Sequence, residues 1–198
     1  MNSTTRRLFI AARPPPAVAT RLRERAALAL DAAEWRVYGA GDIHLTLCFL
    51  GATPSDVLPA LLSALEREVT PLSAADVLIA GVGAFPSASK ARVLWAGVRA
   101  PREELARLGL LERAAFRAAR AAGLEPDESS SGERFLPHIP LARPRTGRRT
   151  SIPERFGKLA LEEVWHVDEV HLFESLGGGF GFERYPSLGV FRCCGATS

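Results

Sequence analysis

The chain has 198 residues, of which 47% are hydrophobic and 24% charged, and its mean hydropathy is +0.05. These values exclude intrinsic disorder and indicate a globular fold that is long enough to bury a substantial core. No apolar run approaches the roughly 18 residues of a membrane-spanning helix. Residues 1–13 lack the apolar stretch of a secretory signal, so no cleaved signal is expected. The formal net charge of +3 is compatible with an anionic ligand but does not specify one.

The cysteine and basic residues give compositional information. The three cysteines, Cys48, Cys193 and Cys194, form no C-x-x-C pattern and leave an odd count, which predicts reduced thiols and a cytoplasmic location. Of the 25 basic residues, only Lys90 and Lys158 are lysines. This arginine excess is most simply a compositional bias, and phosphate recognition by arginine requires that the guanidinium groups cluster.

Hydrophobic periodicity predicts alternating strands and helices along the chain. Helices are expected over residues 14–29, 53–69 (with Pro59 in the first turn) and 101–122 (closed by Gly123). Strands are expected over residues 7–12, 35–38, 42–50 (closed by Gly51), 76–84, 92–98, 135–143, 159–165, 169–175 and 185–192. Between them lie an acidic loop (125–133), a basic loop (143–149) and a Gly-rich turn (177–181).

The order of these elements contains a duplication. A series of strand, helix, His-bearing strand, helix and paired strands occurs once around His44 and again around His138. We therefore expect one domain over residues 1–198, built of two pseudo-symmetric lobes. The fold class is α+β, with an antiparallel sheet flanked by helices in each lobe, and not a parallel nucleotide-binding sheet.

The strand around His44 combines a polar and an apolar face. Side chains alternate along a strand, so His44 and Thr46 point to one face, and Leu45, Leu47 and Phe49 point to the other. Burial of the leucines then directs an imidazole and a hydroxyl together to the opposite face. A single histidine in such a strand is more often structural than catalytic.

The second strand repeats this arrangement. His138 and Pro140 share one face, and Phe135, Ile139 and Leu141 share the other. Two such strands could direct one imidazole each into a shared cleft. Because the unperturbed pKa of imidazole is about 6.5, one ring can be neutral and the other protonated near neutral pH. That pair suits in-line phosphoester chemistry, in which one group deprotonates water and the other protonates the leaving oxygen.

These residues resemble a known family. Residues 44–51 (HLTLCFLG) and 135–143 (FLPHIPLAR) resemble the paired H-x-T-x motifs of the 2H phosphoesterases, in particular those of the RNA 2′,3′-cyclic phosphodiesterase (2′-5′ RNA ligase-like) branch. Residues 7–12, 93–97 and 170–175 resemble other strands of that family. The likeness extends over nearly the whole chain, and two motifs in these places are far more specific than one.

The resemblance implies a bilobal fold around an active-site cleft, with no metal and no cofactor. It implies that RNA ends or cyclic nucleotides are the substrates, and that a 2′,3′-cyclic phosphate is hydrolysed to a 2′-phosphate. Reverse 2′-5′ joining of RNA ends would be a side activity. The protein is expected to act as a monomer, without an obligate protein partner and without a membrane.

The resemblance also implies roles for four residues. His44 would donate a proton to the departing O3′, and His138 would be the base for water. Thr46 would hydrogen-bond a phosphate oxygen, and Arg143 would contact phosphate as well. Strict alternation puts Arg143 on the face opposite His138, so Arg143 must lie beyond the strand end or beyond a bulge.

Pro140 departs from the family pattern, which has threonine or serine at this place. Proline offers neither a hydroxyl nor a backbone N–H, and it is expected at sheet edges or bulges. The departure leaves two alternatives open beside the first function. One is hydrolysis of another small cyclic phosphate, such as a cyclic ADP-ribose phosphate. The other is an RNA-end binding protein with weakened catalysis.

Other signals carry less weight. Cys48 is expected on the face of His44, where a thiolate nucleophile is conceivable, but a small buried thiol is favoured. His166 and His171 lack further ligands for a metal, and the glycines of residues 177–181 lack the Lys-Ser/Thr of a P-loop. The basic loop 143–149 either holds an RNA backbone or is simply solvated.

Overall fold

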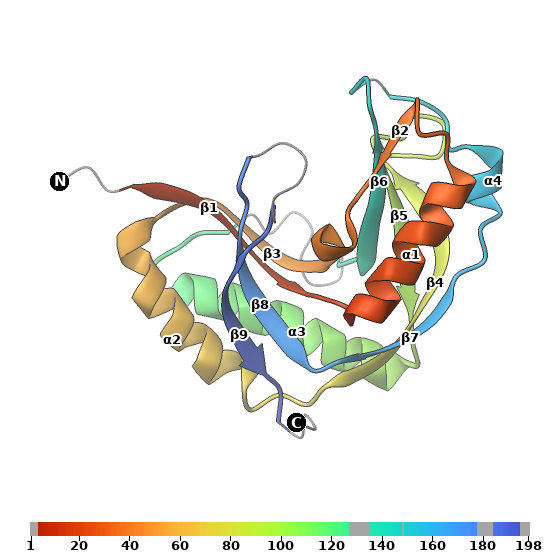
Figure 1. Cartoon of the computed structure of the whole chain (residues 1–198). Helices are drawn as coiled ribbons and strands as arrows, with labels where there is room; N and C mark the ends of the chain where they lie inside the picture. The colour runs from red at the N-terminus through yellow and green to blue at the C-terminus, as the bar shows by residue number, and fades with distance from the viewer. Residues whose placement is uncertain (1–3, 127–134, 148, 178–183, 195–198) are drawn as a thin grey trace.

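The computed structural model describes residues 4–126, 135–147, 149–177 and 184–194. Within them the chain forms two antiparallel sheets flanked by helices, which confirms the predicted α+β class (Figure 1). The first sheet has the order β3 (Leu45–Pro54), β1 (Thr5–Ala12), β8 (Glu169–Glu174) and β9 (Ser187–Arg192). The second has the order β2 (Trp35–Val37), β6 (His138–Pro144), β5 (Val93–Arg99), β4 (Ala75–Phe85) and β7 (Glu162–Val167).

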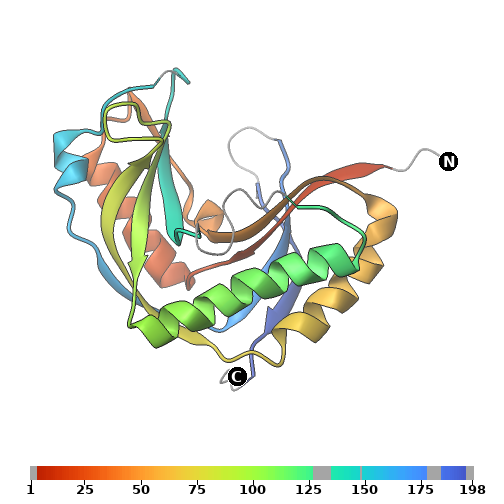
Figure 2. The ribbon, with the colours of Figure 1, turned by 180° about the vertical axis from the view of Figure 1, so that it is seen from behind.

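Among the described residues, each sheet has α-helices on one face only. The helices α2 (Leu58–Val69) and α3 (Arg102–Ala121) lie against the first sheet, and α1 (Pro16–Ala29) lies against the second, beside the short α4 (Glu154–Gly157) (Figures 1 and 2). Leu8 and Ile10 of β1 point to the helices and are buried in the main core, whereas Phe9 points to the other face. We call this second, helix-free side of each sheet its open face.

The predicted strand 42–50 is wrong at both ends. Asp42 belongs to a 3-10 turn (Ala40–Asp42), in which its N–H donates to the carbonyl of Gly39. The strand continues past Gly51 to Pro54, because Gly51 adopts φ 69° at an irregularity and pairing with β1 resumes. His44 therefore lies immediately before the first residue of its strand.

The second His-bearing strand also differs in its bounds. It begins at His138 and not at residue 135, and it ends at Pro144, so Arg143 lies in the strand rather than in the basic loop. Both histidines thus stand at the N-terminal ends of their strands. Most of the acidic loop 125–133 and of the Gly-rich turn 177–181 lies outside the described residues.

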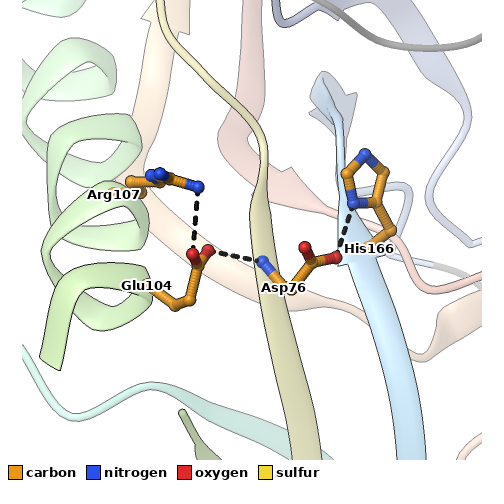
Figure 3. A network of polar contacts seen from close by, with 4 residues as sticks. All are labelled: Asp76, Glu104, Arg107 and His166. Atoms are coloured by element: carbon orange, nitrogen blue, oxygen red, sulfur yellow. Dashed lines mark hydrogen bonds and ion pairs between the residues drawn. The ribbon is translucent and has the colours of Figure 1, made fainter. Parts of the chain in front are cut away.

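A surface network links the first turn of α3 to the second sheet (Figure 3). Glu104 accepts hydrogen bonds from Arg107 (2.9 Å) and from the backbone N–H of Asp76 (2.8 Å). The Asp76 carboxylate lies 2.7 Å from Nδ1 of His166. Exposed ion pairs of this kind stabilise a fold by only about 0–1 kcal/mol each. His166 therefore has a structural partner at the surface.

Candidate active site

His44 and His138 occupy equivalent positions in the two sheets. His44 immediately precedes β3 of the first sheet, and His138 is the first residue of β6 in the second. In each ring Nδ1 lies next to a carbonyl oxygen two residues earlier, that of Asp42 at 2.7 Å and that of Leu136 at 2.9 Å. A carbonyl oxygen only accepts, so Nδ1 carries the proton and Nε2 of the neutral ring keeps its lone pair. Each imidazole is held for proton transfer at Nε2.

A β-bulge interrupts the alternation of β3 three residues after His44. The register with β1 leaves Leu47 without a partner between Thr46 and Cys48. Leu47 and Cys48 are consequently both buried, and Phe49 moves to the open face, where it is 64% exposed. The prediction that Phe49 faces the core is wrong, as is the prediction that Cys48 shares the face of His44.

The bulge also decides the chemistry of Cys48. Its thiol is buried in the core, and burial raises its pKa to about 12. A thiolate, not a thiol, is the nucleophile in cysteine chemistry. Cys48 is therefore a packing residue.

A matching bulge occurs in β6, three residues after His138. Pairing with β5 engages Pro140 and Ala142 and leaves Leu141 without a partner. Leu141 and Ala142 are both buried, and Arg143 returns to the open face that also carries Pro140. A bulge, and not the end of the strand, thus puts Arg143 on the side of His138.

The two sheets bring the histidines close enough for their charges to interact. The pKa of His44 is lowered to about 4, mainly by burial and to a smaller extent by the charges of Arg13 and His138, while the hydrogen bond to the Asp42 carbonyl opposes the shift. Burial also lowers the pKa of His138. His44 is the more strongly affected because it is more completely enclosed. Burial therefore disfavours the protonated form of His44 more strongly than that of His138.

Aromatic rings from distant segments enclose His44. The Phe9 ring centroid lies 4.9 Å from that of His44, and the Tyr185 ring meets it edge-on at 5.3 Å. A pocket of about 250 Å³ opens beside them. Its lining comes from Arg7, Leu8, Phe9, His44, Phe49, Gly51, Ser175 and Tyr185. Alternation along β1 could have placed Phe9 on this face, whereas nothing in the sequence placed Tyr185.

His138 has an aromatic wall of its own. The Phe85 ring meets it edge-on at 4.8 Å, and the Trp95 ring lies 6.2 Å away. Trp95 lies flat on Gly83 of β4, where a Cβ atom would be 2.2 Å from the indole ring. These residues come from β4 and β5, so sequence reasoning missed them.

Thr46 and Pro140 occupy the equivalent places two residues after each histidine. Thr46 is half-buried on the open face, opposite Ala11 of β1. Pro140 lies opposite Trp95 and directly precedes the bulge. Because β2 pairs only with residues 142–144, Pro140 has a strand neighbour on one side alone. This is the setting in which sheets accept proline.

A third histidine, His171, also faces the open side of the first sheet. Its Nδ1 lies 3.2 Å from Ser187 Oγ, and its Nε2 lies 3.6 Å from Glu169 Oε2, which resembles a Ser-His-acid set. However, the Ser187 hydroxyl donates to the carbonyl of Gly189, so His171 cannot accept its proton. The set does not supply an activated serine.

Comparison with known proteins shows which family this chain resembles. The model of the LigT-like phosphoesterases matches residues 10–95. A curated relative from Geobacillus stearothermophilus, named RNA 2′,3′-cyclic phosphodiesterase, is 30% identical over 156 residues. That alignment covers 78% of this chain and 46% of the relative, so the chain spans about half the length of the relative.

Solved structures agree with this placement. The crystal structure of a phosphoesterase superposes with a TM-score of 0.73 at 25% identity, covering 96% of this chain and 99% of that one. E. coli LigT complexed with 3′-AMP gives a TM-score of 0.71 at 24% identity, covering 96% and 98%, which speaks for the fold alone. The chain is thus similar in sequence and in fold to the LigT-like phosphoesterases, which are 2H phosphoesterases.

None of the described helices is long and apolar enough to cross a membrane. In the same residues, no three His, Cys, Asp or Glu side chains gather in a way that could hold a metal ion.

Proposed function

We propose that this protein hydrolyses the 2′,3′-cyclic phosphate of RNA ends or nucleotides to a 2′-phosphate, with His44 and His138 as the acid–base pair. The observation that carries the proposal is the equivalence of the two rings. Each has Nδ1 tied to a carbonyl and Nε2 available, and each comes from a different sheet. The activity named for the Geobacillus relative supports the same reaction.

The proposed reaction is a single in-line displacement. Nε2 of His138 removes a proton from water, and the water oxygen forms a bond to phosphorus. The bond between phosphorus and O3′ breaks as Nε2 of His44 protonates the departing oxygen. Such paired transfer contributes roughly 10²–10⁴-fold per group. No step requires a metal, so EDTA should leave turnover unchanged.

Two side chains on the open faces are proposed to hold the non-bridging oxygens. Thr46 would donate from its hydroxyl, and Arg143 from its guanidinium, which β6 presents on the side of His138. Donors that are already aimed at developing charge lower the barrier without reorganisation. Pro140 adds no donor, so the site has one hydroxyl where the family pattern has two.

The pocket beside His44 suits a nucleobase. Phe49 is exposed at its rim, and Phe9 and Tyr185 form its aromatic walls. Stacking of a base on an aromatic ring is worth roughly 1–3 kcal/mol and tolerates any base. E. coli LigT, which shares the fold, has been crystallised with 3′-AMP. A terminal nucleoside in this pocket would bring its cyclic phosphate next to His44.

The identity of the product tests which bond of the cyclic phosphate breaks, that to O3′ or that to O2′. With 2′,3′-cyclic AMP and EDTA, we expect 2′-AMP, because His44 protonates O3′. Phosphorus NMR and resistance to a 3′-nucleotidase distinguish the isomers. A dominant 3′-AMP product would mean that the cyclic ester binds the other way round. Binding of the cyclic nucleotide without any turnover would instead favour the RNA-end binding protein that Pro140 suggests.

The pH dependence tests the electrostatics of the pair. Catalysis needs one neutral and one protonated ring, and both pKa values are lowered from 6.5, that of His44 to about 4. The singly protonated form is therefore most populated between these pKa values. We expect kcat/KM to be bell-shaped, with an acid limb near pH 4 and a basic limb below pH 6.5. A maximum well above pH 7 would contradict this.

An NMR titration of the two histidines identifies which one is the proton donor. Burial disfavours a proton on His44 in the free protein, whereas the proposed reaction needs one there. The anionic phosphate must therefore raise the pKa of His44 on binding. We expect an NMR titration with and without 2′-AMP to show a higher pKa for His44 in the complex. An unchanged value would assign the donor role to His138.

A further inference from the structure

Four arginines from separate segments gather beside the proposed active site, around Tyr38 and Asp42. We call this set the arginine cluster: Arg13 after β1, Arg36 in β2, Arg143 in β6 and Arg184 before β9. Two of them come from the second sheet, and two from segments that flank strands of the first. The fold thus brings arginines together, which is the condition for phosphate recognition that the composition of the chain did not decide.

The cluster carries an excess of positive charge. The charges of Arg184, Arg13 and Arg36 all oppose the rise that burial imposes on the pKa of Asp42. Arg143 and Arg184 likewise oppose the rise in the pKa of Tyr38. Arg184 Nη1 lies 3.8 Å from Asp42 Oδ2. Three guanidinium groups thus act on the one carboxylate of Asp42.

Two of these arginines place like charges next to each other in the sheet. Arg36 and Arg143 are direct partners in the β2–β6 pair, and both point to the open face. Like charges directly opposite each other destabilise a sheet. An anion beside the two guanidinium groups would convert this repulsion into attraction. With five N–H donors, Arg143 can serve this anion and the cyclic phosphate together.

The other two arginines are held in place by aromatic rings. The Arg13 guanidinium lies 4.5 Å from the centre of the Phe173 ring, and its Nη2 donates to the carbonyl of Tyr185 at 3.0 Å. Arg184 lies over the Tyr185 ring at 5.3 Å. Its Nε is buried and has no hydrogen-bond partner among the described residues. The donors are therefore pre-positioned, and one is unused.

The cluster adjoins His44 directly. Asp42 supplies the carbonyl that orients His44, and Tyr185 contacts both the His44 ring and Arg184. A ligand whose terminal phosphate lies at His44 could therefore place its next phosphate at the cluster. In RNA that group is the phosphate on the 5′ side of the terminal nucleoside.

We infer that the arginine cluster is a second phosphate subsite, which binds the phosphate on the 5′ side of the terminal nucleoside. This deepens the proposed function, on which it rests: the preferred substrate is an RNA 3′ end and not an isolated nucleoside cyclic phosphate. The guanidinium fork suits a phosphate because it donates two parallel, charge-assisted hydrogen bonds.

Three substrates test the subsite: 2′,3′-cyclic AMP, its 5′-phosphorylated form and the dinucleotide ApA ending in a 2′,3′-cyclic phosphate. We expect KM to be roughly tenfold lower for both substrates that carry a 5′-side phosphate, the effect of one charged hydrogen bond of about 1.5 kcal/mol. Equal KM for all three would overturn the inference. So would a gain confined to the dinucleotide, which would assign it to base or ribose contacts.

Variants locate the effect. Arg36→Gln and Arg184→Gln should raise KM for the dinucleotide roughly five- to tenfold and leave turnover of 2′,3′-cyclic AMP within twofold. Each should also reduce the steepness of the plot of log affinity for the dinucleotide against log salt concentration by about 0.7. Arg36→Lys, which keeps the charge, should restore part of the affinity. Arg23→Gln, on the exposed side of α1, is the matched control for charge. Equal losses on both substrates would contradict the subsite.

Direct binding separates this inference from the proposed function. Calorimetry with ApA carrying a 2′-phosphate, compared with 2′-AMP, measures the subsite without turnover. If no cyclic phosphate is hydrolysed, the proposed function fails, but tighter binding of the dinucleotide that Arg184→Gln abolishes still supports the subsite. Equal affinity for both ligands overturns it. Thermal melting of each variant excludes loss of fold as the cause.

Discussion

His44→Ala and His138→Ala are each expected to lower kcat for a 2′,3′-cyclic phosphate by roughly 10²–10⁴-fold. Each variant removes one partner of a concerted proton transfer, and no other described ring stands in an equivalent place. Because the two rings act in one step, the double variant should be little worse than either single one. Steady-state turnover of 2′,3′-cyclic AMP measures the effect.

Two further variants separate chemistry from packing. His44→Asn retains a donor near the position of Nδ1 for the Asp42 carbonyl but offers no acid to protonate the departing oxygen, so it should fold well and remain inactive. His166→Ala is the matched control, because His166 is exposed and bonded to Asp76. Near-normal turnover in either His44→Ala or His138→Ala would refute the assigned pair.

Pro140→Thr is expected to raise turnover, by at most roughly the 10²–10³-fold that a single oxyanion donor contributes. The threonine hydroxyl would stand where Thr46 stands relative to His44, and it would share the charge of the phosphate oxygens. Pro140→Val is the matched control, because valine has the same shape without the hydroxyl. The gain should vanish in a His138→Ala background.

Stability must be measured together with rate for this variant. Pro140 lies beside the bulge at Leu141, with Trp95 as its strand partner, so the restored N–H need not find an acceptor. Thr46→Ala should reduce turnover more than the same change does in a relative with two hydroxyls. If Pro140→Thr folds normally and is no faster, the missing hydroxyl does not limit the reaction.

The sequence by itself determined the elements that carry the site. Alternation in β3 and β6 placed His44 with Thr46 and His138 with Pro140, because the first residues of each strand are regularly pleated. The proline at the start of α1 and the spacing of its buried residues likewise predicted a helix there. These are local signals, which depend only on residues near one another in the chain.

Only the tertiary structure decided which side chains join the histidines. The bulges at Leu47 and Leu141 arise from register with neighbouring strands, and they move Phe49 and Arg143 onto the open faces. No period within a single strand encodes such a shift, because the partner strand determines which residue is left unpaired.

The low pKa of His44 and the arginine cluster both depend on the tertiary structure. The low pKa of His44 results from burial among rings contributed by β1 and by the segment before β9, more than a hundred residues apart. The four arginines are scattered from Arg13 to Arg184 and become one charged surface only when the two sheets assemble. Burial and Coulomb interactions depend on distance in space, so the sequence supplied the groups and the tertiary structure determined their chemistry.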